Sequence, residues 1–243
     1  MPETPRAGHA TPLKGDFIMA PTFATQKASF DDANNVRKAL EGFLVLRKKA
    51  TGKAIPDALS GADGQPIDLK AEGFFAVGMV TTDGFTINRG RETEGVEAFG
   101  YADEVRVDTT KAPKTISTVA LEADKRELLE MVLGQDLSAV QANANGEVVF
   151  DEVSIPLDIE YDAVLLTRDV QKANGGDYFR GCGFPRLALT GDSEESLNAS
   201  SARETPLEFR VLTDNELGTP IRHYMFGEGF RITEQGFKAA AGG

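Results

Sequence analysis

The chain has 243 residues, 41% hydrophobic and 26% charged, which is the composition of a globular protein with a substantial core. Its formal net charge of −12 argues against a surface that wraps nucleic acid, because binding phosphates requires clustered Lys and Arg. The single cysteine, Cys182, excludes an intramolecular disulfide. The apolar stretches are too short to cross a bilayer, so we expect a protein made in the cytoplasm without a membrane partner.

The first residues predict an extended arm rather than a packed element. Residues 1–30 are rich in Pro, Thr and Ala and show no hydrophobic periodicity, so we expect them to order only by docking on something. Residues 31–237 are expected to form a single β domain, and residues 238–243 a flexible tail.

Short strands separated by Gly, Pro and Asp follow the arm. The stretch GFLVLRK predicts a strand over 42–48, and a punctuated loop follows it. The stretch EGFFAVGMVTTDGFTINRG predicts two strands around a tight turn at Asp83-Gly84. Residues 85–113 then alternate apolar and polar side chains in an acidic ribbon, yet they contain no group that obviously performs chemistry.

One helix is predicted at about 121–134. The spacing of Leu128, Leu129, Val132 and Leu133 places them on one helical face. Asp124 is expected in the first turn, where it favours the helix dipole, and Gly134 is expected to end the helix.

The remaining chain predicts further strands, in the stretches EVVFDE, DAVLLTRDV, FPRLALTG, LEFRVLTD and RHYMFGEGF. Leu207, Phe209 and Val211 alternate with Glu208 and Arg210, which is typical of a strand with one face in a core. About ten short strands and one helix predict a mainly β fold, a β-sandwich or barrel-like structure with the helix packed on it.

A search for catalytic chemistry finds no convincing set. There is no phosphate-binding loop, and the glycines of NGGDYFRGCGF are better explained by a turn. Cys182 and His223 would be one nucleophile and one base without a local motif, so a packed structural thiol is the preferred interpretation. We therefore expect no enzyme activity, no cofactor and no metal.

Other acidic and polar motifs have ordinary explanations. Asp57, Asp63 and Asp68 share one loop but lack the spacing of a calcium loop, so we interpret them as turn residues. Asn198 begins an NAS glycosylation motif, which has no meaning without secretion.

The order of these segments resembles a known family. NVR and GFLVLRKKATGKAIPD are followed by the acidic ribbon, then by VRVDTTKAPKTISTVALEADKRELLEMVLG and finally by ETPLEFRVLTDNELGTPIRHYMF. Over roughly residues 34–237, this order resembles the major tail proteins, or tail tube proteins, of long-tailed bacteriophages, particularly those infecting actinobacteria. The specificity of the resemblance lies in the order of the segments rather than in any one motif.

The resemblance implies a structural virion protein located in the phage tail. Such proteins have a tail tube fold, a β-sandwich with a flanking helix, and they assemble into stacked hexameric rings. Their partners would be other copies of the chain, a tape-measure protein in the lumen, and tail terminator and tail-tip proteins. Double-stranded DNA would pass through the tube without specific binding.

The acidic ribbon then has a candidate role. Acids facing the bore would repel DNA, which carries one negative charge per about 1.7 Å of helix axis, so the duplex would slide instead of adhering. The candidate lumen-facing acids are Glu92, Glu94, Glu97, Asp103 and Glu104. The alternatives are a solvated outer face, or salt bridges between rings to Arg89, Arg91 or Arg106.

Other functions stay open from the sequence. A head-decoration or tail-terminator protein of related β fold would form a trimer or one capped ring instead of a tube. A cytosolic β-sandwich binding module would require a concave site with convergent polar groups. The sequence offers no compelling set of residues for such a site.

Overall fold

We describe a computed structural model, which defines residues 22–170, 175–191, 199–200 and 202–239. The chain divides into two compact units, of which the first ends at Val36 and the second begins at Arg37. The described part of the first unit contains helix α1 (Phe23–Phe30) and a 3-10 turn (Ala33–Asn35).

Helix α1 differs from the extended conformation expected there. Thr22 caps the helix, because its hydroxyl oxygen accepts a hydrogen bond from the Thr25 N–H at 3.3 Å. All residues of α1 are exposed, so the helix has no buried face. Without a buried face the sequence needs no periodic apolar residues, and the helix could not be predicted from such a pattern. Residues 1–21 of the expected arm lie outside the described residues.

The second unit is mainly β, as predicted, and its helix α2 spans Arg126–Leu133. The strands in its described residues are β1 (Glu41–Lys48), β2 (Phe75–Ala76), β3 (Val80–Arg89), β4 (Glu92–Val96), β5 (Arg106–Lys111), β6 (Lys114–Ala120), β7 (Glu160–Val170), β8 (Asp177–Leu189), β9 (Thr205–Val211) and β10 (Arg222–Phe226).

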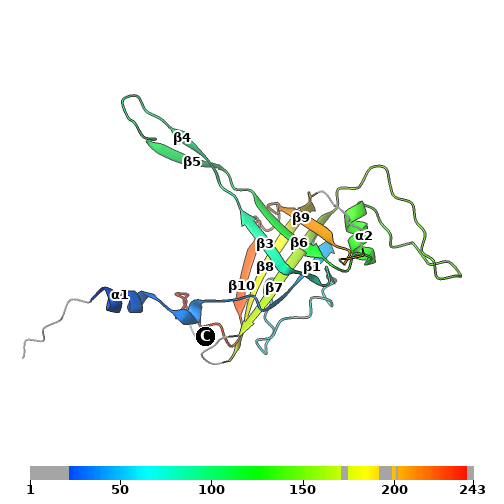
Figure 1. The fold of residues 1–243 in the computed structure, drawn as a ribbon, viewed down its shortest axis with the longest axis horizontal. Coiled ribbons are helices and arrows are strands. Elements are labelled where there is room, and N and C mark those ends of the chain that lie inside the picture. The colour runs from blue at the N-terminus through cyan, green and yellow to red at the C-terminus, as the bar shows by residue number, and fades with distance from the viewer. Residues whose placement is uncertain (1–21, 171–174, 192–198, 201, 240–243) are drawn as a thin grey trace, which may run out of the picture. The chain divides into compact units, whose positions relative to one another are not determined.

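Eight of these strands form one antiparallel sheet (Figure 1). Its order is β2-β1-β7-β8-β9-β6-β3, and β10 pairs with β8 beside this path. Strands β4 and β5 form a separate two-stranded sheet. The main sheet does not close into a barrel, because β2 and β3 are its two unpaired ends.

Both faces of the central strands are buried. Leu44 and Leu46 of β1 pack into a core with Phe184 and with Leu128 of α2. Successive strand residues point to opposite faces, so Val45 between them enters a second core. That core also holds Val164, Phe179 and Tyr224, and residues Leu59, Leu69 and Phe74 of the loop after β1 cover it.

One segment links the two ends of the sheet. The Val77 N–H donates to the Leu44 carbonyl of β1 at 3.0 Å, and the Met79 carbonyl accepts from the Leu121 N–H at 2.9 Å. Gly78 between them has a φ of +93°, and a Cβ there would collide with the carboxylate of Glu122. The chain therefore crosses from the β1 end to the β6 end within three residues.

The tight turn predicted at Asp83-Gly84 is wrong. Residues Val80–Arg89 form one strand, and its pairing with β6 shifts register between Val80 and Phe85. Gly84 has a φ of +68°, and its carbonyl accepts the Thr118 hydroxyl at 2.8 Å. A glycine with positive φ is found in β-bulges as well as in tight turns, so the local sequence does not show which of these two structures forms.

Helix α2 is shorter than predicted, although it ends where expected. Gly134 follows it in the left-handed conformation. Asp124 precedes the helix instead of lying in its first turn. Leu128 and Met131 are buried, whereas Leu129 and Leu133 are half-buried, so the inward face is rotated from the one predicted.

A strand predicted over residues 147–152 is absent, although the strands predicted in the other four C-terminal stretches form. The stretch EVVFDE has the composition of a strand, but the described chain offers it no hydrogen-bonding neighbour strand.

A buried ion pair lies within the sheet. Arg47 of β1 and Asp162 of β7 are directly opposite in register, and Asp162 is 0% exposed. The Arg47 Nε donates to Asp162 Oδ2 at 3.1 Å, and its terminal nitrogens donate to the Glu72 and Ala54 carbonyls at 2.9 and 3.1 Å. The Arg47 guanidinium also lies 4.4 Å from the centre of the Phe74 ring. These contacts connect the loop after β1 to the sheet.

We predict that Asp162→Asn lowers the free energy of unfolding by about 3 kcal/mol, because it leaves the Arg47 charge buried without its counter-ion. Urea unfolding followed by circular dichroism measures the change. Asp108→Asn is the matched control, since Asp108 pairs with Arg106 on the surface and its loss should change little. Equal effects of the two substitutions would contradict the role given to the buried pair.

Candidate functional site

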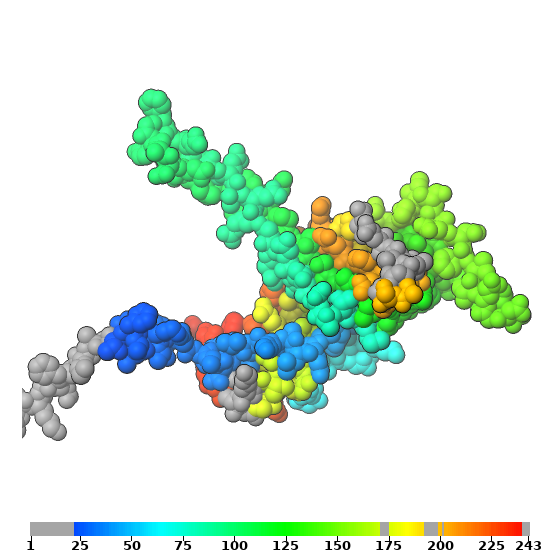
Figure 2. Space-filling model, in the orientation of Figure 1, coloured from blue at the N-terminus to red at the C-terminus, as the bar shows by residue number. Residues whose placement is uncertain are grey.

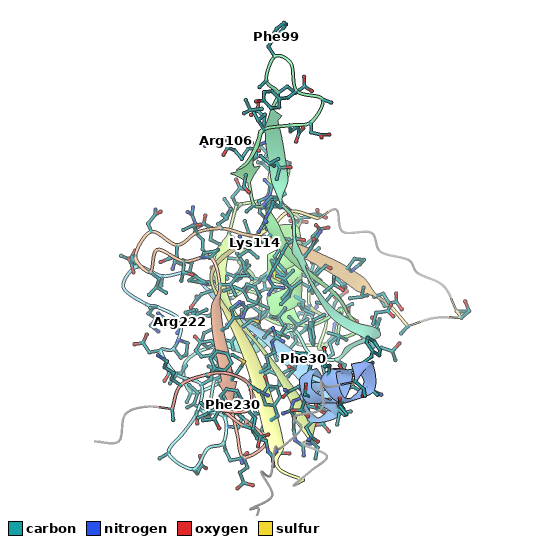
Figure 3. The ribbon with its side chains drawn as sticks, turned by 90° about the vertical axis from the view of Figure 1, so that its left-hand side faces the viewer. Phe30, Phe99, Arg106, Lys114, Arg222 and Phe230 are labelled. Atoms are coloured by element: carbon teal, nitrogen blue, oxygen red, sulfur yellow. The ribbon has the colours of Figure 1, made fainter. Side chains whose placement is uncertain are left out.

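The acidic ribbon forms a hairpin that continues the main sheet outward. Arg89 of β3 is paired with Lys114 of β6, and the next hydrogen bond runs from the Gly90 N–H to the Pro113 carbonyl at 2.8 Å. Glu92 is then paired with Lys111 in the same alignment. Residues 90–113, called the projecting hairpin below, therefore extend the β3–β6 ladder beyond the sheet (Figures 1 and 3).

The two faces of the projecting hairpin differ in chemistry. Residues opposite each other in an antiparallel pair point to the same face. One face therefore carries the pairs Glu94–Asp108 and Val96–Arg106, and the other carries Thr93–Thr109 and Gly95–Val107. Three of the four paired residues on the first face are charged, and all four on the second are uncharged.

The structure separates the five candidate acids. Glu92 and Glu94 lie on the charged face, where Glu92 pairs with Lys111 at 3.2 Å. Glu104 lies on the other face, because its carboxylate occupies the space where a Cβ on Gly95 would be. Glu97 and Asp103 are exposed in the loop at the tip.

Of the three arginines expected as salt-bridge partners, Arg106 pairs with Asp108 at 2.8 Å. Asp108 stands directly opposite Glu94, so Arg106 offsets part of a repulsion between like charges. Neither Arg89 nor Arg91 forms an ion pair with an acid in the described chain.

Sequence reasoning noted that this hairpin alternates apolar and polar residues, but it gave the apolar ones no role. Phe99 is exposed at its tip (Figure 3). Tyr101, Val96, Val105 and Val107 of the hairpin are exposed as well. Large apolar side chains that gather on a projection indicate a surface that another molecule covers. The signal available in the sequence was the pair of aromatic residues flanking a turn glycine, Gly100.

Cys182 and His223 do meet in the fold. They are directly opposite on β8 and β10, with 3.4 Å between the Cys182 Sγ and the His223 Nδ1. Burial raises the pKa of the Cys182 thiol. Burial also lowers the pKa of His223, and the charges of Arg89 and Arg180 lower it further. Both shifts in pKa favour the neutral thiol and the neutral imidazole over a thiolate–imidazolium pair.

The loop acids have structural roles. The Asp63 Oδ1 accepts the Gln65 N–H at 3.0 Å, and the Asp68 Oδ1 accepts the Lys70 N–H at 2.9 Å, which confirms both as turn residues. Asp57 instead accepts a hydrogen bond from Arg222 at 2.6 Å. Asn198 lies outside the described residues.

Within the described ranges, no group of three or more His, Cys, Asp or Glu side chains is arranged to hold a metal ion. No helix in the same ranges is both long and apolar enough to span a membrane. No known family model matches the chain, and no curated protein matches its sequence.

We predict that Cys182 in the folded protein reacts with iodoacetamide at pH 7 at least about tenfold more slowly than in urea, because its raised pKa and its burial limit the exposed thiolate. Mass spectrometry of the alkylated chain gives both rates. His223→Ala should leave the rate in the folded state within about twofold. Fast alkylation that titrates below pH 7 and is lost in His223→Ala would instead indicate a thiolate–imidazolium pair.

Proposed function

We propose that this chain is a structural virion protein that assembles into stacked hexameric rings and forms the tube of a phage tail. Genome DNA would be delivered to the host cell through that tube. The resemblance of residues 34–237 to tail tube proteins supplies the assembly and its place in the virion. The projecting hairpin, with apolar residues and no partner in the described chain, is the observation that carries the proposal.

The hairpin is unlike a solvated surface loop. Its two strands pair only with each other, so each keeps an open edge of backbone N–H and C=O groups. The exposed Val96, Phe99, Tyr101, Val105 and Val107 add apolar surface to those edges. A monomer that leaves both uncovered is prone to associate, and repeated association of one chain with itself produces rings or filaments.

The charge of the chain suits a conduit for DNA. Six copies at −12 each carry about −72, which disfavours adhesion of the duplex to the wall. Of the candidate lumen residues, Glu92 and Glu94 lie together on the charged face of the hairpin, which supports a place for this face in the bore. We assign the bore to that face, and the aromatic tip to contact with another copy.

The partners follow from this role. Other copies would form the rings, a tape-measure protein would occupy the lumen before DNA, and terminator and tip proteins would close the two ends of the tube. A head-decoration protein or a tail terminator would instead form a closed trimer or a single ring. A binding module would keep the hairpin uncovered and stay monomeric with a ligand in a pocket.

Electron microscopy of the purified protein across a concentration series tests the proposal. We expect hollow tubes or stacked six-fold rings, and fewer of them for Phe99→Ser/Tyr101→Ser, which removes the aromatic tip without touching the sheet core. Phe23→Ser/Phe30→Ser is the matched control for loss of two exposed aromatic rings elsewhere. A closed trimer or a compact dimer with a ligand pocket would contradict the tube.

The lumen assignment has its own test. We expect tubes of the Glu92→Lys/Glu94→Lys variant to retain short duplex DNA that wild-type tubes exclude, with retention falling steeply as salt rises. Sedimentation of tubes with fluorescent DNA measures this. Glu72→Lys/Glu216→Lys makes the same charge change at two exposed acids outside the hairpin and should leave exclusion intact. Equal retention by both variants would contradict a bore lined by Glu92 and Glu94.

A further inference from the structure

A second segment of the chain also lacks a partner. Residues Glu147–Asp158, called the acidic segment below, run without helix or strand hydrogen bonding, and all of them are exposed. Gln135, itself buried, holds the segment at its middle. Its side-chain nitrogen donates to the Asp151 carbonyl at 3.1 Å, and its side-chain oxygen accepts the Val153 N–H at 2.9 Å.

The acidic segment is also fixed at its two ends. The Leu157 N–H donates to the Gly134 carbonyl at 2.8 Å, next to the end of α2. At the other end, the Asn143 N–H donates to the Glu147 carbonyl at 2.8 Å, and the Asn143 side chain accepts the Glu147 N–H at 3.0 Å. These contacts hold a stretch of extended chain away from the sheet while leaving most of its backbone groups without partners.

The segment exposes several apolar side chains. Val148 is 57% exposed, Val149 is 67% exposed, Ile155 is 82% exposed and Leu157 is 64% exposed. The chain bends at Ser154 and Ile155, so Val148 and Val149 belong to the straight stretch before the bend. The stretch that the sequence predicts as a strand, residues 147–152, is therefore a strand sequence without a neighbouring strand.

The charge of the segment indicates what covers it. Its charged residues are all acidic, namely Glu147, Asp151, Glu152 and Asp158, and residues 135–159 contain no Lys or Arg. A surface that binds it should therefore be basic and should offer an open strand edge.

The same chain carries such a surface, at the base of the projecting hairpin. Strand β3 ends the main sheet and pairs with β6 on one side only, and β4, which follows it, pairs only with β5. Arg89 and Arg91 are exposed where β3 passes into β4, with Lys114 opposite Arg89. Neither arginine forms an ion pair in the part of the chain that the structure describes. We call the part of this edge that carries Arg89, Arg91 and Lys114 the basic edge, and it ends where Glu92 and Glu94 of β4 begin the charged face assigned to the bore.

We propose that the acidic segment of one copy adds as a strand to the basic edge of a neighbouring copy, so that its carboxylates meet Arg89 and Arg91. The lengths are compatible, because the stretch Glu147–Val153 before the bend spans roughly 23 Å at about 3.3 Å per residue, and the β3–β4 edge, Val80–Val96, spans roughly 55 Å. This inference rests on the proposed function, since it supplies the contact that joins subunits within the tube.

The two surfaces belong to different parts of the chain, so the contact is head-to-tail. Within the second unit, the projecting hairpin and the acidic segment extend from different sides of the main sheet (Figures 1 and 2). A contact between two different surfaces leaves one of each free after every addition, and it ends only when the copies close into a ring. A closed six-membered ring consumes all of them.

Charge reversal with rescue tests this contact. Asp151→Arg/Glu152→Arg and, separately, Arg89→Glu/Arg91→Glu should each raise the concentration needed for half-assembly at least tenfold, measured by sedimentation velocity. The chain carrying all four substitutions should assemble within about threefold of wild type, because the opposite charges face each other again. Lys53→Glu, an exposed lysine in the loop after β1, is the control and should have no effect.

Cross-linking gives a second readout that does not depend on complete assembly. Val149→Cys and Arg91→Cys chains, both carrying Cys182→Ser, are mixed and oxidised. We expect a disulfide-linked dimer that contains one chain of each kind, and no such product from a Val149→Cys, Lys53→Cys mixture. A failure to cross-link above the Lys53→Cys level, together with wild-type assembly of both reversal variants, would overturn the contact.

The outcomes separate this inference from the proposed function. Hollow tubes formed by all variants would overturn the strand addition and leave the tail tube intact. Cross-linking of the cysteine variants, together with wild-type chains that form only a closed trimer or dimer, would support the contact and contradict the tube.

Discussion

Burial of both faces of the strands β1, β7 and β8 is the constraint on which the rest of the structure depends. Leu44 and Val45 are neighbours in sequence but belong to different cores, so each strand residue has a fixed side. A slip of one residue would exchange the two cores and would also separate Arg47 from Asp162. Helix α2 and the loop after β1 are held on opposite faces by these two cores, which completes a stable body within one chain.

Two segments take no part in that body. The projecting hairpin and the acidic segment place apolar side chains in solvent and leave backbone groups without partners, although the cores do not need either of them. Buried or paired backbone is the rule in a finished sheet. Under the proposed function, these two segments would be completed by other copies of the chain. The opposite charges of the acidic segment and the basic edge would then make that contact directional.

The sequence predicted the position of several strands and of the end of the helix better than it predicted which residues pair or pack with them. Alternation located β9, with Leu207 and Phe209 inward as expected, and Gly134 ended α2 as expected. Local signals failed where the outcome depended on distant residues. Gly84 suits a bulge as well as a turn, and only its pairing with β6 decides between them. The approach of Cys182 to His223 follows from the pairing of β8 with β10, which no single segment encodes.

The claim that other copies complete these two segments is tested most directly by amide hydrogen exchange, compared between the monomer and the assembled protein. The account predicts fast exchange in residues 92–111 and 147–157 of the monomer and slowing by at least about tenfold in both stretches on assembly, because new backbone hydrogen bonds form there. The strands β7 and β8 should exchange slowly in both states. Assembly that leaves both stretches unprotected, with slowing elsewhere, would contradict the account.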